Sequence, residues 1–435
     1  MSSDETIAID GNVYRALPIE LYEQVASNLT PNDLARLARV SDLFTSLSTR
    51  LLYRAICLPC STRAGTVVEL FQTLRDHQHL SELVIRVDVA WDPASAIITA
   101  SMPASPVSVE EDKDWDENLT EYVVAAPGRH PTGSVIAQAL TSGKLQNMEF
   151  LSISSALELG GPFFLGREGN SSHKGTILPR LRQLHLFSVP FHSSYGVPAF
   201  VAEHPALESL TLFGLSASLP RALTRLKKLH TLRSAGIGHD WRGTLGRSGT
   251  DAKDSRTPQV PNVRRLDLPH EDLISDEKYF FALQKVFPGV TQVIITRELS
   301  TFAFRAGWAA NQPTWESVRR IALRWCISES LTSPTQVVRG LLFLGRACPG
   351  IRTVDILCLC PDPWHKHLGA DLIRAASKDV IRAILPHLKD LHIMTFAGRA
   401  FCRRVDESTP SALDDFEEQP ITAQHEVPIV PFHLL

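Results

Sequence analysis

A short apolar pattern recurs along most of the chain and limits the fold more than any other feature of the sequence. The pattern has apolar residues at its first, fourth and sixth positions, so it is written apolar-x-x-apolar-x-apolar. Most gaps between well-formed copies are 26 to 37 residues long, as from 181 to 207 and from 351 to 388. Well-formed copies begin at Leu80, Met148, Leu181, Leu207, Val263, Val290, Val318, Ile351 and Leu388, and a poorer copy begins at Leu226.

Each copy predicts a short strand with one buried face. Side chains alternate between the two faces of a strand, so the fourth and sixth residues of the pattern point the same way. Segments between copies, such as 279–287 and 337–344, have the apolar spacing of helices. One strand–helix unit cannot bury its apolar face, whereas a stack of units can. The sequence therefore predicts an α/β fold of stacked units, and an ordinary α/β domain with parallel strands is the alternative.

The recurring pattern resembles the leucine-rich repeat, in an irregular form with a long period. Cys326 is the one residue that fits the position of that family's asparagine ladder. The resemblance implies that residues between the apolar strand positions form a concave face that binds a target protein. Their mixed charges suit a protein surface better than a polyanion, and the alternative is that they are merely solvated. The candidate target-binding residues are Gln183, His185, Arg265, Asp267, Arg320, Arg324, Asp355 and His392.

Residues 17–53 predict three short helices before the first copy of the pattern. Pro18 suits the first turn of a helix, where its missing N–H costs nothing. Leu21, Val25 and Leu29 follow at four-residue spacing and therefore share one helix face. Three helices of this length bury little surface when alone. The surplus of apolar residues predicts a face that docks on a partner, with a cap on a larger domain as the alternative.

The starts of the second and third helices are also marked. Thr30 is a candidate N-cap, and Pro31 follows it at the first helical position. The third helix is expected to begin near Ser41 and to close at Tyr53.

The order of residues in this helical segment resembles the F-box. Residues 17–21 match Leu-Pro-x-Glu-Leu, residues 33–41 match Asp-Leu-x-x-Leu-x-x-Val-Ser, and residues 52–53 match the closing Leu-Tyr. The resemblance implies a docking surface for the Skp-type adaptor of a Skp–cullin–F-box ubiquitin ligase, and through that adaptor an association with a cullin. The residues implied as adaptor contacts or local core are Leu17, Pro18, Leu21, Leu34, Val40 and Phe44.

The two resemblances together predict how the chain is divided. Residues 1–16 are expected to be a disordered tail, 17–59 an F-box-like module, 60–400 a leucine-rich-repeat-like solenoid and 401–435 a second tail. Loop insertions are expected near residues 92–135, 155–178 and 236–259.

Composition excludes several classes of function. Lys and Arg total 44 against 47 Asp and Glu, a net charge of −3, which argues against broad electrostatic binding of nucleic acid. Seven cysteines are too few and too scattered for a secreted disulfide framework. The acidic N-terminus does not resemble a signal peptide, and no apolar run approaches bilayer length. We therefore expect a cytoplasmic or nuclear chain with no membrane or nucleic-acid partner.

Candidate chemistry is sparse. Cys358, Cys360, His365 and His367 are soft donors, but one residue separates the members of each pair where structural zinc sites use two to four. The pair Cys57–Cys60 has redox spacing yet follows a predicted helix with no strand before it. The sequence therefore predicts no catalytic residues, metal or cofactor. We expect an adaptor; a ligase-independent repeat scaffold is the alternative, and a hydrolase or metal enzyme on an α/β fold is the rival class.

Overall fold

The computed structural model divides the chain into two compact units. Unit 1 comprises Met1–Ser152 and Ile177–Leu181, and unit 2 comprises Ile153–Thr176 and Arg182–Leu435. The predicted tail at 1–16 and the predicted insertions lie largely outside the described residues. The structure describes residues 18–59, 62–90, 131–154, 177–187, 197–213, 219–235, 259–268, 283–298, 314–326, 335–359, 378–384, 388, 390–396, 399–403 and 416–419, with the backbone of 8–9 and 12–13.

Unit 1 opens with three helices, as predicted. They are α1 (Ile19–Ala26), α2 (Pro31–Leu37) and α3 (Asp42–Arg54), preceded by the two-residue strands β1 (Ala8–Ile9) and β2 (Asn12–Val13). Thr30 and Ser41 cap α2 and α3, because each hydroxyl accepts a hydrogen bond from the backbone amide three residues later, that of Asp33 or Phe44. Pro18 is the residue before α1, one position earlier than the first turn predicted for it. We call residues 18–54 the helical module.

The helical module has a small core of its own. Ala26, Leu34 and Leu47 are buried, one from each helix. Tyr22 and Phe44 pack against this core with their rings edge to face, 5.6 Å apart between centroids. The module therefore holds its shape with very few fully buried side chains.

Strands and covering helices complete unit 1. β3 (Ala55–Leu58) follows α3 directly and pairs in parallel with β4 (Arg86–Val89). A strand at Ala55–Leu58 was not expected. The remaining elements are α4 (Ala64–Asp76), α5 (Gln78–Ser81), α8 (Pro131–Thr141), which packs on α4, and β5 (Phe150–Ser154), where the two units divide.

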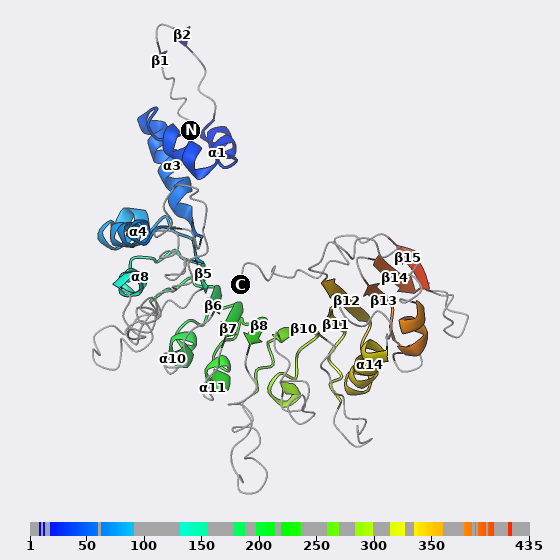
Figure 1. Cartoon of the computed structure of the whole chain (residues 1–435). Coiled ribbons are helices and arrows are strands. Elements are labelled where there is room, and N and C mark those ends of the chain that lie inside the picture. The colour runs from blue at the N-terminus through cyan, green and yellow to red at the C-terminus, as the bar shows by residue number, and fades with distance from the viewer. Residues whose placement is uncertain are drawn as a thin grey trace, which may run out of the picture. The chain divides into compact units, whose positions relative to one another are not determined.

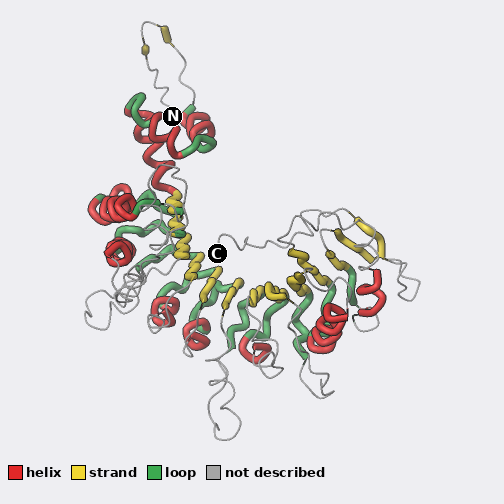
Figure 2. Tube along the Cα trace, in the orientation of Figure 1, coloured by secondary structure: helices red, strands yellow, loops and turns green. Residues whose placement is uncertain are grey.

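Unit 2 is a row of parallel strands with helices on one side (Figures 1 and 2). Its first eight strands pair in chain order, each with the next. They are β6 (Gln183–Phe187), β7 (Ser209–Phe213), β8 (Thr231–Ala235), β9 (Arg265–Leu268), β10 (Gln292–Glu298), β11 (Arg320–Cys326), β12 (Thr353–Leu359) and β13 (Ile393–Phe396). The helices are α10 (Val197–Ala202), α11 (Leu219–Leu223) and α14 (Thr335–Ala347), and residues 283–286 and 378–384 are also helical.

Two antiparallel strands end the row. β14 (Arg399–Arg403) pairs with β13, and β15 (Phe416–Gln419) pairs with β14. Both strands fall at or within the segment predicted as a C-terminal tail.

Each repeat is joined to the one before it by the same backbone hydrogen bonds. Two successive amides at the start of a strand donate to one carbonyl of the preceding repeat, as Glu208 and Ser209 do to Arg182. The amides of Arg319 and Arg320 likewise share the carbonyl of Thr291, and those of Arg352 and Thr353 share that of Arg319. This recurring bond pattern sets a common register for the strands of unit 2.

The buried residues confirm the predicted repeat at most copies. The three apolar residues of the copies starting at Met148, Leu181, Leu207, Val263, Val290, Val318 and Ile351 are all at most 2% exposed. The fold is thus an N-terminal helical module followed by repeated strand–helix units of the leucine-rich-repeat-like α/β type.

Three predicted copies are wrong in register. The copies at Leu226 and Leu388 begin three residues early, because Leu232 pairs with Leu210 and Met394 pairs with Val354. In both cases the leucine three residues before the correct start of the copy is also buried, which explains the error. Its carbonyl accepts a turn hydrogen bond, as that of Leu388 does from the Leu391 amide. The copy at Leu80 is wrong for another reason. Residues 83–85 are all apolar, so the sequence allows several registers, and the residues buried in the structure are Val84, Val87 and Val89.

Candidate functional site

The exposed apolar side chains of the described residues gather in the helical module. Every large hydrophobic residue that counts as exposed lies between residues 19 and 43. Val25 and Val40 are the most exposed of these residues, at 66% and 67%. The set is Ile19, Leu21, Val25, Leu29, Val40 and Leu43, which we call the apolar module surface.

Exposure separates the residues implied by the F-box resemblance into two groups. Pro18, Leu21 and Val40 are exposed and free to meet a partner. Leu34 is buried in the module core, and Phe44 is half-buried against it. Leu17 lies outside the described residues. Whether the exposed residues bind an adaptor stays a prediction.

Polar contacts hold the helices under this surface. Arg50 of α3 forms an ion pair with Glu23 of α1, with 2.8 Å between Nη1 and Oε1. The Thr45 hydroxyl donates to the carbonyls of Ala38 and Ser41, which ties α3 to the end of α2. The exposed apolar residues therefore lie on helices that are already joined to one another, or, for Leu29 and Val40, in the turns that follow α1 and α2.

The second candidate surface is the face of the unit 2 strands opposite the apolar core. Alternate residues of each strand lie on this face, and the register aligns them into two rows. The first row is Gln183, Ser209, Thr231, Arg265, Gln292, Arg320 and Thr353. The second row is His185, Thr211, Arg233, Asp267, Ile294, Ala322, Asp355 and Thr395.

Asp355 and Arg320 form a completed pair on this strand face. The Asp355 side chain is fully buried, and its Oδ2 lies 2.6 Å from Nε of Arg320. The other oxygen accepts from Arg320 Nη2 at 3.3 Å and from the Thr395 hydroxyl at 2.8 Å. Both carboxylate oxygens thus have partners within the protein.

Arg265 and Asp267 form a second pair two residues apart on β9. Arg265 donates from Nε and Nη2 to the two oxygens of Asp267, at 2.9 and 3.0 Å. Arg233 of the neighbouring strand aligns with Asp267 but is only 6% exposed, and its Nε has no hydrogen-bond partner. Burial is the main cause that lowers the Arg233 pKa; Arg265 also lowers it, whereas Asp267 raises it.

The remaining predicted target residues are dispersed. Gln183 is exposed and His185 is half-buried, both on β6. His392 is exposed but precedes β13, so it is not on the strand face where the prediction placed it. Arg324 lies within β11, and its side chain is outside the described residues.

Arg233 and Thr231 were missed from the sequence because the copy at Leu226 was placed three residues early. The true copy is Leu229-x-x-Leu232-x-Ser234, with a buried serine at the third apolar position. The run Leu226, Leu229, Leu232 at three-residue spacing was the signal that could have revealed the correct register.

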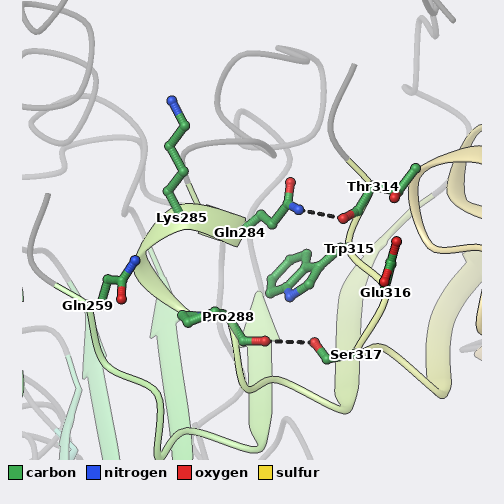
Figure 3. Close-up of a pocket in the computed structure, with 8 residues that line it drawn as sticks. All are labelled: Gln259, Gln284, Lys285, Pro288, Thr314, Trp315, Glu316 and Ser317. Atoms are coloured by element: carbon green, nitrogen blue, oxygen red, sulfur yellow. Dashed lines mark hydrogen bonds between the residues drawn. The ribbon is translucent and has the colours of Figure 1, made fainter. Parts of the chain in front are cut away.

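A cavity of about 390 Å³ lies where two successive repeats of unit 2 meet (Figure 3). Trp315 is almost fully buried beside it, and the Ser317 hydroxyl donates to the Pro288 carbonyl at 2.8 Å. The Gln284 amide donates to the Thr314 carbonyl. These bonds join the repeats through backbone carbonyls, which is a structural task. The lining residues are Gln259, Gln284, Lys285, Pro288, Thr314, Trp315, Glu316 and Ser317.

The candidate metal and redox residues are only partly described. Within the described ranges, no group of three or more His, Cys, Asp or Glu side chains could hold a metal ion. Cys358 lies on β12 with its side chain undescribed, and Cys360, His365 and His367 are outside the described residues. Cys57 is exposed on β3, and its predicted partner Cys60 is also outside.

Comparisons with known proteins add little to this geometry. No protein-family model matches the sequence, and no curated protein matches it. Among solved structures, the chain is similar to the leucine-rich repeat-containing protein LegL7 from Legionella pneumophila. The identity is 13%, the match covers 58% of this chain and 85% of that chain, and the TM-score is 0.29. The fold assignment therefore rests on the parallel strands, their register and the buried repeat.

The two surfaces suit contacts with other proteins. The first row of the strand face carries polar and charged side chains that are exposed or half-buried, whereas the second row is largely buried. The helical module exposes six large apolar side chains. None of the described helices is long and apolar enough to cross a bilayer.

Proposed function

We propose that this chain is the substrate-recognition adaptor of a Skp–cullin–F-box E3 ubiquitin ligase. In this proposal the helical module binds the Skp-type adaptor, and through it a cullin, while the strand face of the repeats binds a target protein. The single observation that carries the proposal is the apolar module surface, which coincides with the segment that resembles the F-box.

The energetics of the helical module support a partner at this surface. Its core of Ala26, Leu34 and Leu47 is small, while six large apolar residues remain in contact with water. Burying apolar surface contributes about 25 cal/mol for each Å² removed from water. A partner that covers these residues would therefore gain binding free energy from their burial, and its binding would stabilise the folded module.

The proposed mechanism is proximity. Holding the target beside a ubiquitin-loaded enzyme raises the effective concentration of the reacting groups without any bond chemistry by this chain. No catalytic residue or cofactor is assigned to it. The proposal places the chain in the cytoplasm, the nucleus or both, where such a ligase acts.

The alternative is a repeat scaffold that works without a ligase. In that case the helices only cap the first strands, and their exposed apolar residues have no adaptor to bind. The two functions differ in one measurable property, which is affinity for a Skp-type adaptor.

The decisive experiment uses substitutions in the full chain. Removing residues before 61 would also delete β3, which pairs with β4, so truncation would damage the sheet. We expect Val25→Glu combined with Val40→Glu to weaken binding of a purified Skp-type adaptor by about tenfold or more, since each change places a charge on an interface residue. Both side chains are mostly exposed, so the melting temperature should stay nearly unchanged.

The matched control is Gln24→Glu combined with Ser46→Glu, which adds the same charge at exposed polar positions of α1 and α3, close in sequence to Val25 and Val40. Adaptor binding close to wild type in the control and lost in the apolar pair supports the proposal. Failure of the folded wild-type chain to bind the adaptor would refute it and favour the scaffold.

A further inference from the structure

Three adjacent strands of unit 2 carry an uneven set of charges on their polar face. β7, β8 and β9 are in register, so Thr211, Arg233 and Asp267 lie side by side. Arg265 lies two residues before Asp267 on β9 and therefore on the same face of the strand. Counted over these named residues alone, two guanidinium groups accompany one carboxylate.

The excess charge belongs to Arg233. Asp267 already accepts from Arg265 through both oxygens, in the bidentate geometry that suits a guanidinium. Arg233 is more than nine-tenths buried and its Nε has no partner. A buried N–H donor without a hydrogen-bond partner is unfavourable, because it has lost water, and the nearby charge of Asp267 offsets only part of this cost.

The neighbouring groups leave an approach to this arginine. The Arg265 and Asp267 side chains keep 18% and 11% of their surface exposed, so solvent reaches the face beside Arg233. Thr231 is half-buried, aligns with Arg265 and lies two residues before Arg233 on the same face; its hydroxyl already forms a hydrogen bond with Nδ1 of His230, 3.0 Å away. The site therefore combines the Arg233 guanidinium and the Thr231 hydroxyl on β8 with the Arg265 guanidinium on the neighbouring strand β9.

We propose that Arg233, with Arg265 beside it, binds the carboxylate of an acidic side chain presented by a target protein. One excess positive charge matches one carboxylate. A phosphate carries nearly two negative charges at neutral pH, so Asp267 would repel it more strongly than it repels a carboxylate. The assignment rests on the proposed function only in that the strand face holds the target; it does not require the adaptor.

The other charged pair on this face shows why the site is confined to β7–β9. Arg320 and Asp355 neutralise each other, and Thr395 completes the hydrogen bonds of the carboxylate. Between the two pairs, the aligned row contains only Ile294 and Ala322. Neither of these two aligned residues offers a charge to an acidic ligand.

The test measures binding of fluorescein-labelled hexaglutamate to the full chain by fluorescence anisotropy, with hexaglutamine as the uncharged control. We expect Arg233→Gln to weaken hexaglutamate binding about tenfold. Arg225→Gln removes the same charge from an exposed turn and should change the dissociation constant less than about twofold. Asp267→Asn removes the opposing carboxylate and should tighten binding.

Each outcome decides the proposal. Equal weakening by Arg233→Gln and Arg225→Gln, or no preference for hexaglutamate over hexaglutamine, would overturn it. Displacement of the probe by inorganic phosphate at far lower concentration than by acetate would overturn the choice of a carboxylate. If Arg233→Gln does not fold, Asp267→Asn decides, because unchanged or weaker binding in that variant contradicts the proposal. Loss of adaptor binding alone would leave these measurements unaffected.

Discussion

Asp355 shows how a single residue on the strand face can serve the fold instead of a ligand. A fully buried carboxylate is tolerated because Arg320 and Thr395 supply hydrogen bonds to both of its oxygens. The repeat resemblance implies a target-binding role for Asp355 and Arg320, and that role stays a prediction. Their mutual pairing does predict a large effect on stability.

We expect Asp355→Ala to lower the free energy of unfolding by about 3 kcal/mol, because it leaves a partly buried guanidinium without its partner. Asp379→Ala is the matched control: it breaks an ion pair with Arg382 at a similar distance, but both side chains are mostly exposed. The control should cost about 1 kcal/mol or less. Urea unfolding of the two variants measures both values, and equal losses would contradict the structural role of Asp355.

At the scale of elements, the turns that lead into the strands determine how closely successive repeats approach. Gly289 and Gly350 each follow a proline just before a strand. A Cβ at Gly289 would lie 2.1 Å from the carbonyl oxygen of Pro261, which belongs to the preceding repeat. At Gly350 the nearest atom belongs instead to the Arg319 side chain, which can move.

Gly289→Ala should therefore destabilise the chain by about 1–3 kcal/mol, because backbone must shift to make room. Gly65→Ala is the control, since a Cβ at that position in α4 meets nothing within 4 Å. Alanine is favoured over glycine in a helix, so the control should be neutral or slightly stabilising. Thermal unfolding of both variants checks this order, and an undamaged Gly289→Ala chain would contradict the close approach.

At the scale of the whole molecule, unit 2 behaves as a series of equivalent repeats, each joined mainly to its neighbours. Ile294 of β10 aligns with Ala322 of β11, and Thr291 occupies in its repeat the position that Arg319 occupies in the next. Stability in such arrays is approximately a sum over repeats and their interfaces. Removal of one whole repeat should therefore preserve the fold.

Deletion of residues 290–317 joins Gly289 to Val318, which is the residue equivalent to Val290. We expect this variant to fold with a lower melting temperature. Deletion of 290–318 removes one residue more and turns the apolar residues of β11 to the opposite face, so it should not fold into a stable array. Circular dichroism and thermal unfolding distinguish the two, and similar behaviour of both variants would contradict the repeat register.

Local patterns in the sequence determined the elements of this protein. Alternation of apolar residues predicted the strands, and capping residues such as Thr30 and Ser41 predicted the helix starts. Both signals depend only on neighbours within a few residues. Where the local pattern allowed two registers, as at Leu226 and Leu388, the choice between them was wrong. Pairing with the neighbouring strand decides such cases, and that contact is distant in sequence.

Only the tertiary structure decided which side chains are available to a partner. Leu34 and Val40 both lie in the segment that resembles the F-box, yet Leu34 is buried in the module core and Val40 is exposed. Arg233 became a candidate only when its strand was aligned with β9 and Asp267 was seen to be occupied by Arg265. Burial and hydrogen-bond partners are properties of the packed chain, because they depend on residues brought together from different repeats.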